Sequence, residues 1–165
     1  MASDRKWVTL AFILYACNLR IDKQGKPRMS NNRHLIEQYF ASLTGQTDTP
    51  ISDYFADDIV WHLPPAHPFG GPFIGLNDVL DMLGQGSHLF RFETITIDRR
   101  ALIIEGDNAA VHFILNAKMH DNRDYSNEYL FRFQCQDGKI SQVWECMDTY
   151  YQYTVGMFDT SEWRN

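Results

Sequence analysis

The stretch DGKISQVWECMD, residues 137–148, is a turn followed by a long strand that carries carboxylates among apolar side chains. Well upstream, YFADDIVWHLP at residues 54–64 combines a short acidic turn, a strand and a proline that ends the strand. Carboxylates are costly to bury in an apolar strand. Their presence therefore indicates a lined cavity, and we interpret the two stretches as the two ends of one pocket.

The rest of the chain changes its hydrophobic period once. Helical periodicity predicts helices over residues 32–45, 48–55 and 76–83. Strand patterns separated by turn signals then predict strands at 59–63, 73–74, 88–98, 101–104, 109–120, 125–136 and 140–150. Helices followed by an antiparallel meander predict an α+β fold. We expect three helices packed on a curved, mostly antiparallel sheet, a cone with a pocket between the layers.

Composition limits the classes of partner. The 165 residues carry a net charge of −6, which argues against binding to nucleic acid or to an anionic membrane. Eleven Phe, eight Tyr and four Trp supply a large aromatic core. The three cysteines are odd in number and lack metal-ligand spacing, so we expect reduced thiols and a cytoplasmic location.

The amino-terminal segment differs from the remainder in charge. Residues 1–33 hold seven Lys and Arg against two Asp, whereas the later residues are strongly acidic. The apolar run at 8–17 is too short to span a bilayer and has the layout of a signal peptide, in which case the protein is exported. The alternative is a leader outside the fold, with Met29 as a natural start. We expect residues 1–31 to be a leader or extension, 32–155 the domain and 156–165 a tail.

The order of the short motifs resembles the nuclear transport factor 2-like superfamily, and within it the SnoaL-like and ketosteroid-isomerase-like branch. The resemblance covers about residues 32–155 and rests on YFADD at 54–58, WHLP at 61–64, YLFRF at 129–133, DGKI at 137–140 and WECMD at 144–148. It implies small cone-shaped α+β barrels that form dimers. Such proteins include isomerases, dehydratases, polyketide cyclases, epoxide hydrolases and binding modules without activity, so the fold does not fix the function.

The resemblance also places the ketosteroid isomerase site on this chain. The tyrosine that donates to the oxyanion falls on Tyr39, and the protonated oxyanion aspartate falls on Tyr129. The general-base aspartate falls on Leu63, which cannot move a proton. The chain therefore departs from a true ketosteroid isomerase while keeping two phenolic donors.

Glu145 is the candidate that the strand pattern favours for acid–base chemistry. It alternates with Val143 and Met147, so the three side chains share one face of the strand. If that face looks inward, burial raises the pKa of the Glu145 carboxyl and suits it to proton transfer. If the strand has the opposite parity, Asp148 is the carboxylate in the cavity.

Apolar and aromatic side chains on the predicted inner faces complete the expected pocket. Asn127 and Tyr129 add polar groups to one strand, and His88 matches a cavity histidine of scytalone-dehydratase-like members. The expected ligand-binding residues are Trp61, Leu63, His88, Asn127, Phe131, Val143 and Met147.

Other site types are not favoured. His112 and His120 lie eight residues apart on one strand, about 26 Å, and cannot share a metal ion. The chain has no phosphate-binding glycine loop and no serine elbow, so we expect neither a metal nor a cofactor. The sequence predicts a homodimer that acts on a small apolar ligand of polyketide, steroid or terpenoid type. Isomerase, dehydratase (lyase) or cyclase chemistry is the first hypothesis, and a ligand-binding or dimerisation module without turnover is the second.

Overall fold

The computed structural model describes residues 31–158 of the chain. The chain divides into two units, residues 1–31 and 32–165, and every element below belongs to the second. The apolar run at 8–17 and the start-like Met29 lie outside the described residues. None of the described helices is both long and apolar enough to cross a bilayer.

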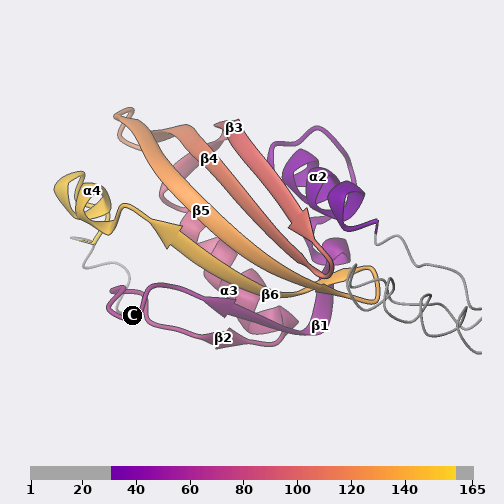
Figure 1. Cartoon of the computed structure of the whole chain (residues 1–165). Helices are drawn as coiled ribbons and strands as arrows, with labels where there is room; N and C mark the ends of the chain where they lie inside the picture. The colour runs from indigo at the N-terminus through magenta and orange to yellow at the C-terminus, as the bar shows by residue number, and fades with distance from the viewer. Residues whose placement is uncertain (1–30, 159–165) are drawn as a thin grey trace, which may run out of the picture. The chain divides into compact units, whose positions relative to one another are not determined.

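One six-stranded sheet has the strand order β2-β1-β6-β5-β4-β3 (Figure 1). The strands are β1 (Phe55–His62), β2 (Phe73–Ile74), β3 (Phe90–Glu105), β4 (Asn108–Met119), β5 (Asp124–Gln136) and β6 (Lys139–Met147). Strand β1 runs parallel to β6, and the other neighbouring pairs are antiparallel. Trp61 of β1 thus pairs with Val143 of β6, so the stretches 54–64 and 137–148 are direct neighbours in the sheet.

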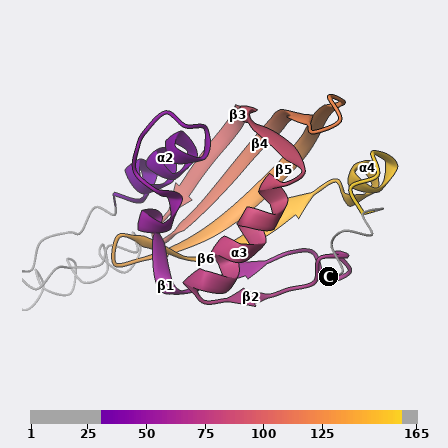
Figure 2. The same ribbon diagram turned by 180° about the vertical axis from the view of Figure 1, so that it is seen from behind.

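Helices α2 (Asn32–Leu43) and α3 (Leu76–Ser87) lie across the same face of the sheet (Figure 2). Helix α2 buries Ile36, Tyr39 and Phe40, which recur at helical spacing on one side. The chain leaves this helix through Gly45, whose φ of +67° is a conformation that glycine adopts readily. A 3₁₀ turn, η1 (Ile51–Tyr54), leads into β1, and helix α4 (Thr149–Thr154) follows β6.

The core lies between this face of the sheet and the helices. Strand β5 shows the alternation most clearly, because every second residue from Tyr125 to Cys135 is buried and its neighbours are more exposed. Ring contacts join the layers: Phe40 of α2 packs edge-on against Phe113 of β4, with centroids 5.1 Å apart. The unit is therefore an α+β fold with helices on one face of a curved mixed sheet, as predicted.

Several boundaries differ from the sequence prediction. The helix predicted over 48–55 is only the 3₁₀ turn η1, and the strand predicted from residue 59 already begins at Phe55. Residues 88–98 and 101–104 are not separate strands but parts of β3, which stays paired to β4 across two register shifts. Helix α3 continues through Gly84 and Gly86 instead of ending there. The strand predicted to reach Tyr150 ends at Met147, because Asp148 starts α4 by accepting a hydrogen bond from the Tyr151 backbone N–H at 2.9 Å.

Candidate functional site

Three strands bring the central residues of the site together on the helix-covered face. Phe131 of β5 pairs with Glu145 of β6, and Trp61 of β1 pairs with Val143. Since side chains alternate along a strand, Val143, Glu145 and Met147 share this face. Val143 is fully buried, and Met147 packs against the core. Phe131 packs edge-on against Trp61, with ring centroids 5.6 Å apart.

The carboxylate of Glu145 accepts a hydrogen bond from an indole. Trp61 Nε1 donates to Glu145 Oε2 at 2.7 Å. The residue as a whole is half-buried, but its carboxyl group is more deeply enclosed by protein. Burial raises the pKa of Glu145 to about 7, and the hydrogen bond from Trp61 opposes part of that rise. The carboxyl is thus balanced near neutral pH between its acid and base forms.

Two buried phenols lie within reach of the charge on Glu145. Tyr39 is 1% exposed and is enclosed by the rings of Phe40, Phe55 and Phe133. Burial and then the negative charge of Glu145 raise the pKa of Tyr39. Within residues 31–158 the Tyr39 hydroxyl forms no hydrogen bond. Because its pKa is raised above the already high value of an ordinary tyrosine, the Tyr39 hydroxyl is protonated at neutral pH.

Tyr129 is the second phenol. Its ring stacks on Phe113, with centroids 5.3 Å apart and an interplanar angle of 7°. Its hydroxyl lies 2.8 Å from the hydroxyl of Tyr125. Burial first, and then the charges of Tyr125 and Glu145, raise the pKa of Tyr129 well above its ordinary value. Glu145, Tyr39 and Tyr129 thus form one electrostatically coupled group of one carboxyl and two neutral phenols.

Of the remaining predicted residues, Leu63 and Asn127 are at least partly buried in the core, whereas Asp148 and His88 are exposed. Leu63 is half-buried and packs against the core. Asn127 is 3% exposed, and its amide nitrogen donates to the Tyr125 hydroxyl at 2.9 Å and to the Asp148 backbone oxygen at 3.1 Å. The Asp148 side chain is engaged in capping α4, and His88 is exposed at the end of α3. The structure therefore does not bring Asp148 or His88 together with Glu145.

Sequence reasoning did not propose three polar residues that the structure connects to Tyr129 through hydrogen bonds. His67, from the loop between β1 and β2, and Gln152, from α4, are both buried, and their side chains are 3.2 Å apart. Gln152 also donates to Tyr125 at 3.4 Å. Tyr125 could have been found from its alternation with Asn127 and Tyr129. No pattern marked the other two, because their contact spans 85 residues.

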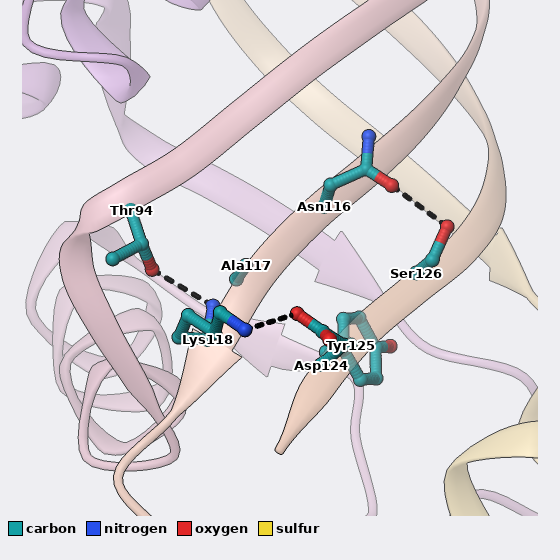
Figure 3. A pocket seen from close by; sticks show the side chains of 7 residues that line it. All are labelled: Thr94, Asn116, Ala117, Lys118, Asp124, Tyr125 and Ser126. Atoms are coloured by element: carbon teal, nitrogen blue, oxygen red, sulfur yellow. Dashed lines mark hydrogen bonds and ion pairs between the residues drawn. The ribbon is translucent and has the colours of Figure 1, made fainter. Parts of the chain in front are cut away.

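Two open surface pockets lie elsewhere. One, of about 420 Å³, lies between β3, β4 and β5 and is lined by Thr94, Asn116, Ala117, Lys118, Asp124, Tyr125 and Ser126 (Figure 3). Its polar side chains bind one another: Lys118 pairs with Asp124 at 2.6 Å, and Ser126 donates to Asn116 at 2.7 Å. The other, of similar size, surrounds the start of α3 near Asp57 and Asp78. Within the described part of the chain, no group of three or more His, Cys, Asp or Glu has the geometry to hold a metal ion.

Comparisons with known proteins agree with this architecture. The family model described as a SnoaL-like domain matches residues 36–143. No curated protein matches the sequence. Among solved structures, an NTF2-like protein of unknown function from Burkholderia pseudomallei is similar at 15% identity and a TM-score of 0.66, covering 76% of this chain and 97% of that one.

Two further structures have functional names. A proposed SnoaL-like polyketide cyclase from Jannaschia sp. CCS1 is 14% identical, with a TM-score of 0.65 and coverage of 79% of this chain and 96% of that one. A proposed isomerase from Rhodopseudomonas palustris is 20% identical, with a TM-score of 0.62 and coverage of 78% and 98%. At these identities the likeness shows the fold alone.

Proposed function

Because the chain belongs to the SnoaL-like domain family of the NTF2-like superfamily, we propose that it is a small-molecule enzyme that performs proton transfer without a cofactor. The reaction class is isomerisation, dehydration or cyclisation of an apolar, oxygenated ligand of polyketide, steroid or terpenoid type. The observation that carries the proposal is the Glu145 carboxyl, held by Trp61 Nε1 at 2.7 Å with its pKa raised to about 7.

The roles of the two carboxylate oxygens differ. Trp61 occupies Oε2, whereas Oε1 has no hydrogen-bond partner within residues 31–158. Oε1 is therefore the atom that takes a proton from a carbon next to a carbonyl and returns it at another position. As the proton leaves, negative charge grows on the carbonyl oxygen. Tyr39 and Tyr129 are neutral phenols whose raised pKa values keep them protonated, and they donate hydrogen bonds to that charge.

The chain's own residues also favour a second candidate. Leu63 stands where the ketosteroid-isomerase-like proteins resembled here carry their general base, and it packs into the core. A binding module without turnover keeps the apolar wall and the phenols but needs no base. Whether Glu145 replaces the missing aspartate separates the two candidates.

The test begins with mass spectrometry of ligands that copurify with the full-length protein, followed by turnover assays on those compounds. Glu145→Gln preserves the shape and still accepts the Trp61 hydrogen bond, but it cannot take up a proton. We expect kcat to fall about 10²-fold or more while ligand affinity stays within a few-fold. Tyr39→Phe is the matched milder change, since Tyr129 also donates to the same oxygen. Unchanged turnover in Glu145→Gln would contradict the role of Glu145 as the base, whereas no turnover of any copurified compound by the unaltered protein would favour the binding module.

Assembly and location belong to the same proposal. The sheet face away from α2 and α3 carries exposed apolar side chains, which supports a twofold homodimer through that face. The reduced Cys135 and Cys146 support a cytoplasmic location.

A further inference from the structure

A chain of buried hydrogen bonds connects the loop after β1 to Tyr129. It runs from His67 to Gln152, from Gln152 to Tyr125 and from Tyr125 to Tyr129. Each of the four residues is less than a tenth exposed. None of them was needed to build the Glu145–Trp61 pair. A buried polar chain is costly unless its groups are satisfied, so the direction in which each hydrogen points can be deduced.

The backbone fixes the direction at the His67 end. The Phe69 backbone N–H donates to His67 Nδ1 at 3.2 Å. A backbone N–H can only donate, so Nδ1 carries no proton and the neutral ring carries its proton on Nε2. That proton points at Gln152 Oε1, 3.2 Å away. A reversed Gln152 amide would place two donors face to face, so its nitrogen must point the other way, to Tyr125.

A second backbone group fixes the far end independently. The Asp148 backbone oxygen can only accept, and it lies 3.1 Å from the Asn127 amide nitrogen. The same nitrogen lies 2.9 Å from the Tyr125 hydroxyl. The Tyr125 oxygen therefore accepts from both Asn127 and Gln152. Its two lone pairs are used, and its single proton is donated to Tyr129 at 2.8 Å.

The consequence falls on Tyr129. Its oxygen already accepts from Tyr125, so its own proton cannot point back along the chain. The Gln152 side chain also acts on Tyr129 as a hydrogen-bond donor, which lowers the Tyr129 pKa. Within residues 31–158 no group accepts a hydrogen bond from the Tyr129 hydroxyl. Tyr129 lies next to Glu145 on the site face, since Tyr129 pairs with Met147 and Phe131 with Glu145.

We infer that His67, Gln152 and Tyr125 are positioning residues that turn the Tyr129 hydroxyl proton toward the Glu145 site, where it donates to an acceptor oxygen of the bound ligand. The inference rests on the proposed function in taking this face as the ligand site. Hydrogen bonds in a chain polarise one another, so accepting the Tyr125 proton makes Tyr129 a stronger donor than the same buried phenol would be without Tyr125. Burial also lowers the pKa of His67, which keeps the ring in the neutral form that the chain needs.

The first measurement needs no ligand. Nitrogen-15 NMR of histidine-labelled full-length protein is expected to show His67 as the Nε2–H tautomer, staying neutral below its ordinary pKa of 6.5. The groups that contact the ring within the described residues are the Gln152 amide and the rings of Phe69 and Phe158, none of them charged. An Nδ1–H tautomer would overturn the assigned direction of the whole chain.

The second measurement uses a matched pair of probes, 2-acetylnaphthalene and its hydrocarbon analogue 2-isopropenylnaphthalene. The ketone presents an oxygen to the Tyr129 hydroxyl, whereas the hydrocarbon presents a CH₂ group of similar shape. We expect the full-length protein to bind the ketone about 3- to 10-fold more tightly, the value of one hydrogen bond. Tyr129→Phe should reduce this preference to what Tyr39 alone supplies and leave hydrocarbon affinity unchanged. Equal affinities, or no measurable binding of the ketone, contradict the inference.

Two substitutions of Gln152 distinguish a role in orienting the hydrogen bonds of the chain from a purely structural role. Gln152→Glu only accepts, so the Tyr125 proton turns to the new carboxylate and Tyr129 donates back to Tyr125. The ketone preference then falls to that of Tyr129→Phe. Gln152→Met also removes the amide, but Asn127 still orients Tyr125, so the preference persists. A purely structural role predicts similar effects for both. The ketone preference does not depend on proton transfer by Glu145, so failure of the acid–base role and failure of the chain give different results.

Discussion

At the scale of single residues, the central fact is the free energy that it costs to bury the ionised Glu145 carboxylate. A carboxyl on an apolar sheet face receives one hydrogen bond, from Trp61, and burial raises its pKa to about 7. Its pKa in the unfolded chain is near 4.5. The folded state therefore holds the proton more tightly than the unfolded state does. The stability that this group contributes is fully present below its pKa in the unfolded chain, 4.5, and is lost as the pH rises through its folded-state pKa of about 7.

Because the pKa of Glu145 is higher in the folded state than in the unfolded state, this carboxyl should destabilise the protein at neutral pH. Glu145→Gln carries no charge, keeps the acceptor for Trp61 and should raise the free energy of unfolding above pH 7, by up to about 3 kcal/mol. Near pH 4.5 the two proteins should be almost equal in stability. Urea unfolding of both proteins across this range checks the difference. A constant difference at all pH values would mean that Glu145 is ionised normally in the folded protein.

At the scale of elements, local pattern was enough for some features and not for others. Period-two alternation correctly placed Val143, Glu145 and Met147 on one face, because a strand allows only two parities. It failed at the end of β6, where Tyr150, Tyr151 and Tyr153 have high strand propensity and concealed the helix that Asp148 begins.

Packing decided the remaining differences. The glycines of α3 each disfavour a helix by about 1 kcal/mol. The apolar side of the helix, including the fully buried Val79, outweighs that cost. The contact of His67 with Gln152 joins a loop to a helix across 85 residues, and no local periodicity encodes such a distance.

Asp148 gives a prediction about an element. As the cap of α4 it accepts from the Tyr151 N–H at 2.9 Å, and its carboxylate is not part of the Glu145 site. Asp148→Ala should lower the free energy of unfolding by about 1 kcal/mol and speed hydrogen exchange in α4. Asp148→Asn is the control, because asparagine caps almost equally well and should preserve stability. Loss of turnover in Asp148→Asn with stability intact would assign Asp148 to the chemistry instead.

At the scale of the whole molecule, the division of the chain leads to a truncation experiment. Residues 32–165 form their own unit, and that unit contains all six strands of the sheet. Deletion of residues 1–28 should therefore leave a cooperative thermal transition at nearly the same temperature as that of the full-length chain. Calorimetry of both proteins is the measurement. A broad, non-cooperative transition after truncation would show that the leader belongs to the fold.

The outer face of the sheet is what makes this molecule a candidate for assembly. Leu130 and Ile103 are 50% and 64% exposed, and Cys146, the register partner of Leu130, is also exposed. Beside them, Trp144 stacks on His62 with ring centroids 4.8 Å apart, and the Arg132 guanidinium lies 4.1 Å from the Trp144 ring centre. Apolar side chains gathered on one side of a long sheet need cover, and a second copy of the same face supplies it with twofold symmetry.

Sedimentation analysis at micromolar concentration should therefore show a dimer of the full-length protein. Leu130→Asp places a charge at the centre of the face and should raise the dimer dissociation constant about 10-fold or more. Tyr153→Asp is the matched control, since Tyr153 is 63% exposed but lies on α4, away from the sheet. The face would not be the interface if both variants dissociated equally, or if the unaltered protein were already monomeric. If only Leu130→Asp dissociates and its turnover persists, the site on the opposite face works within one subunit, because no residue assigned to it comes from the outer side of the sheet.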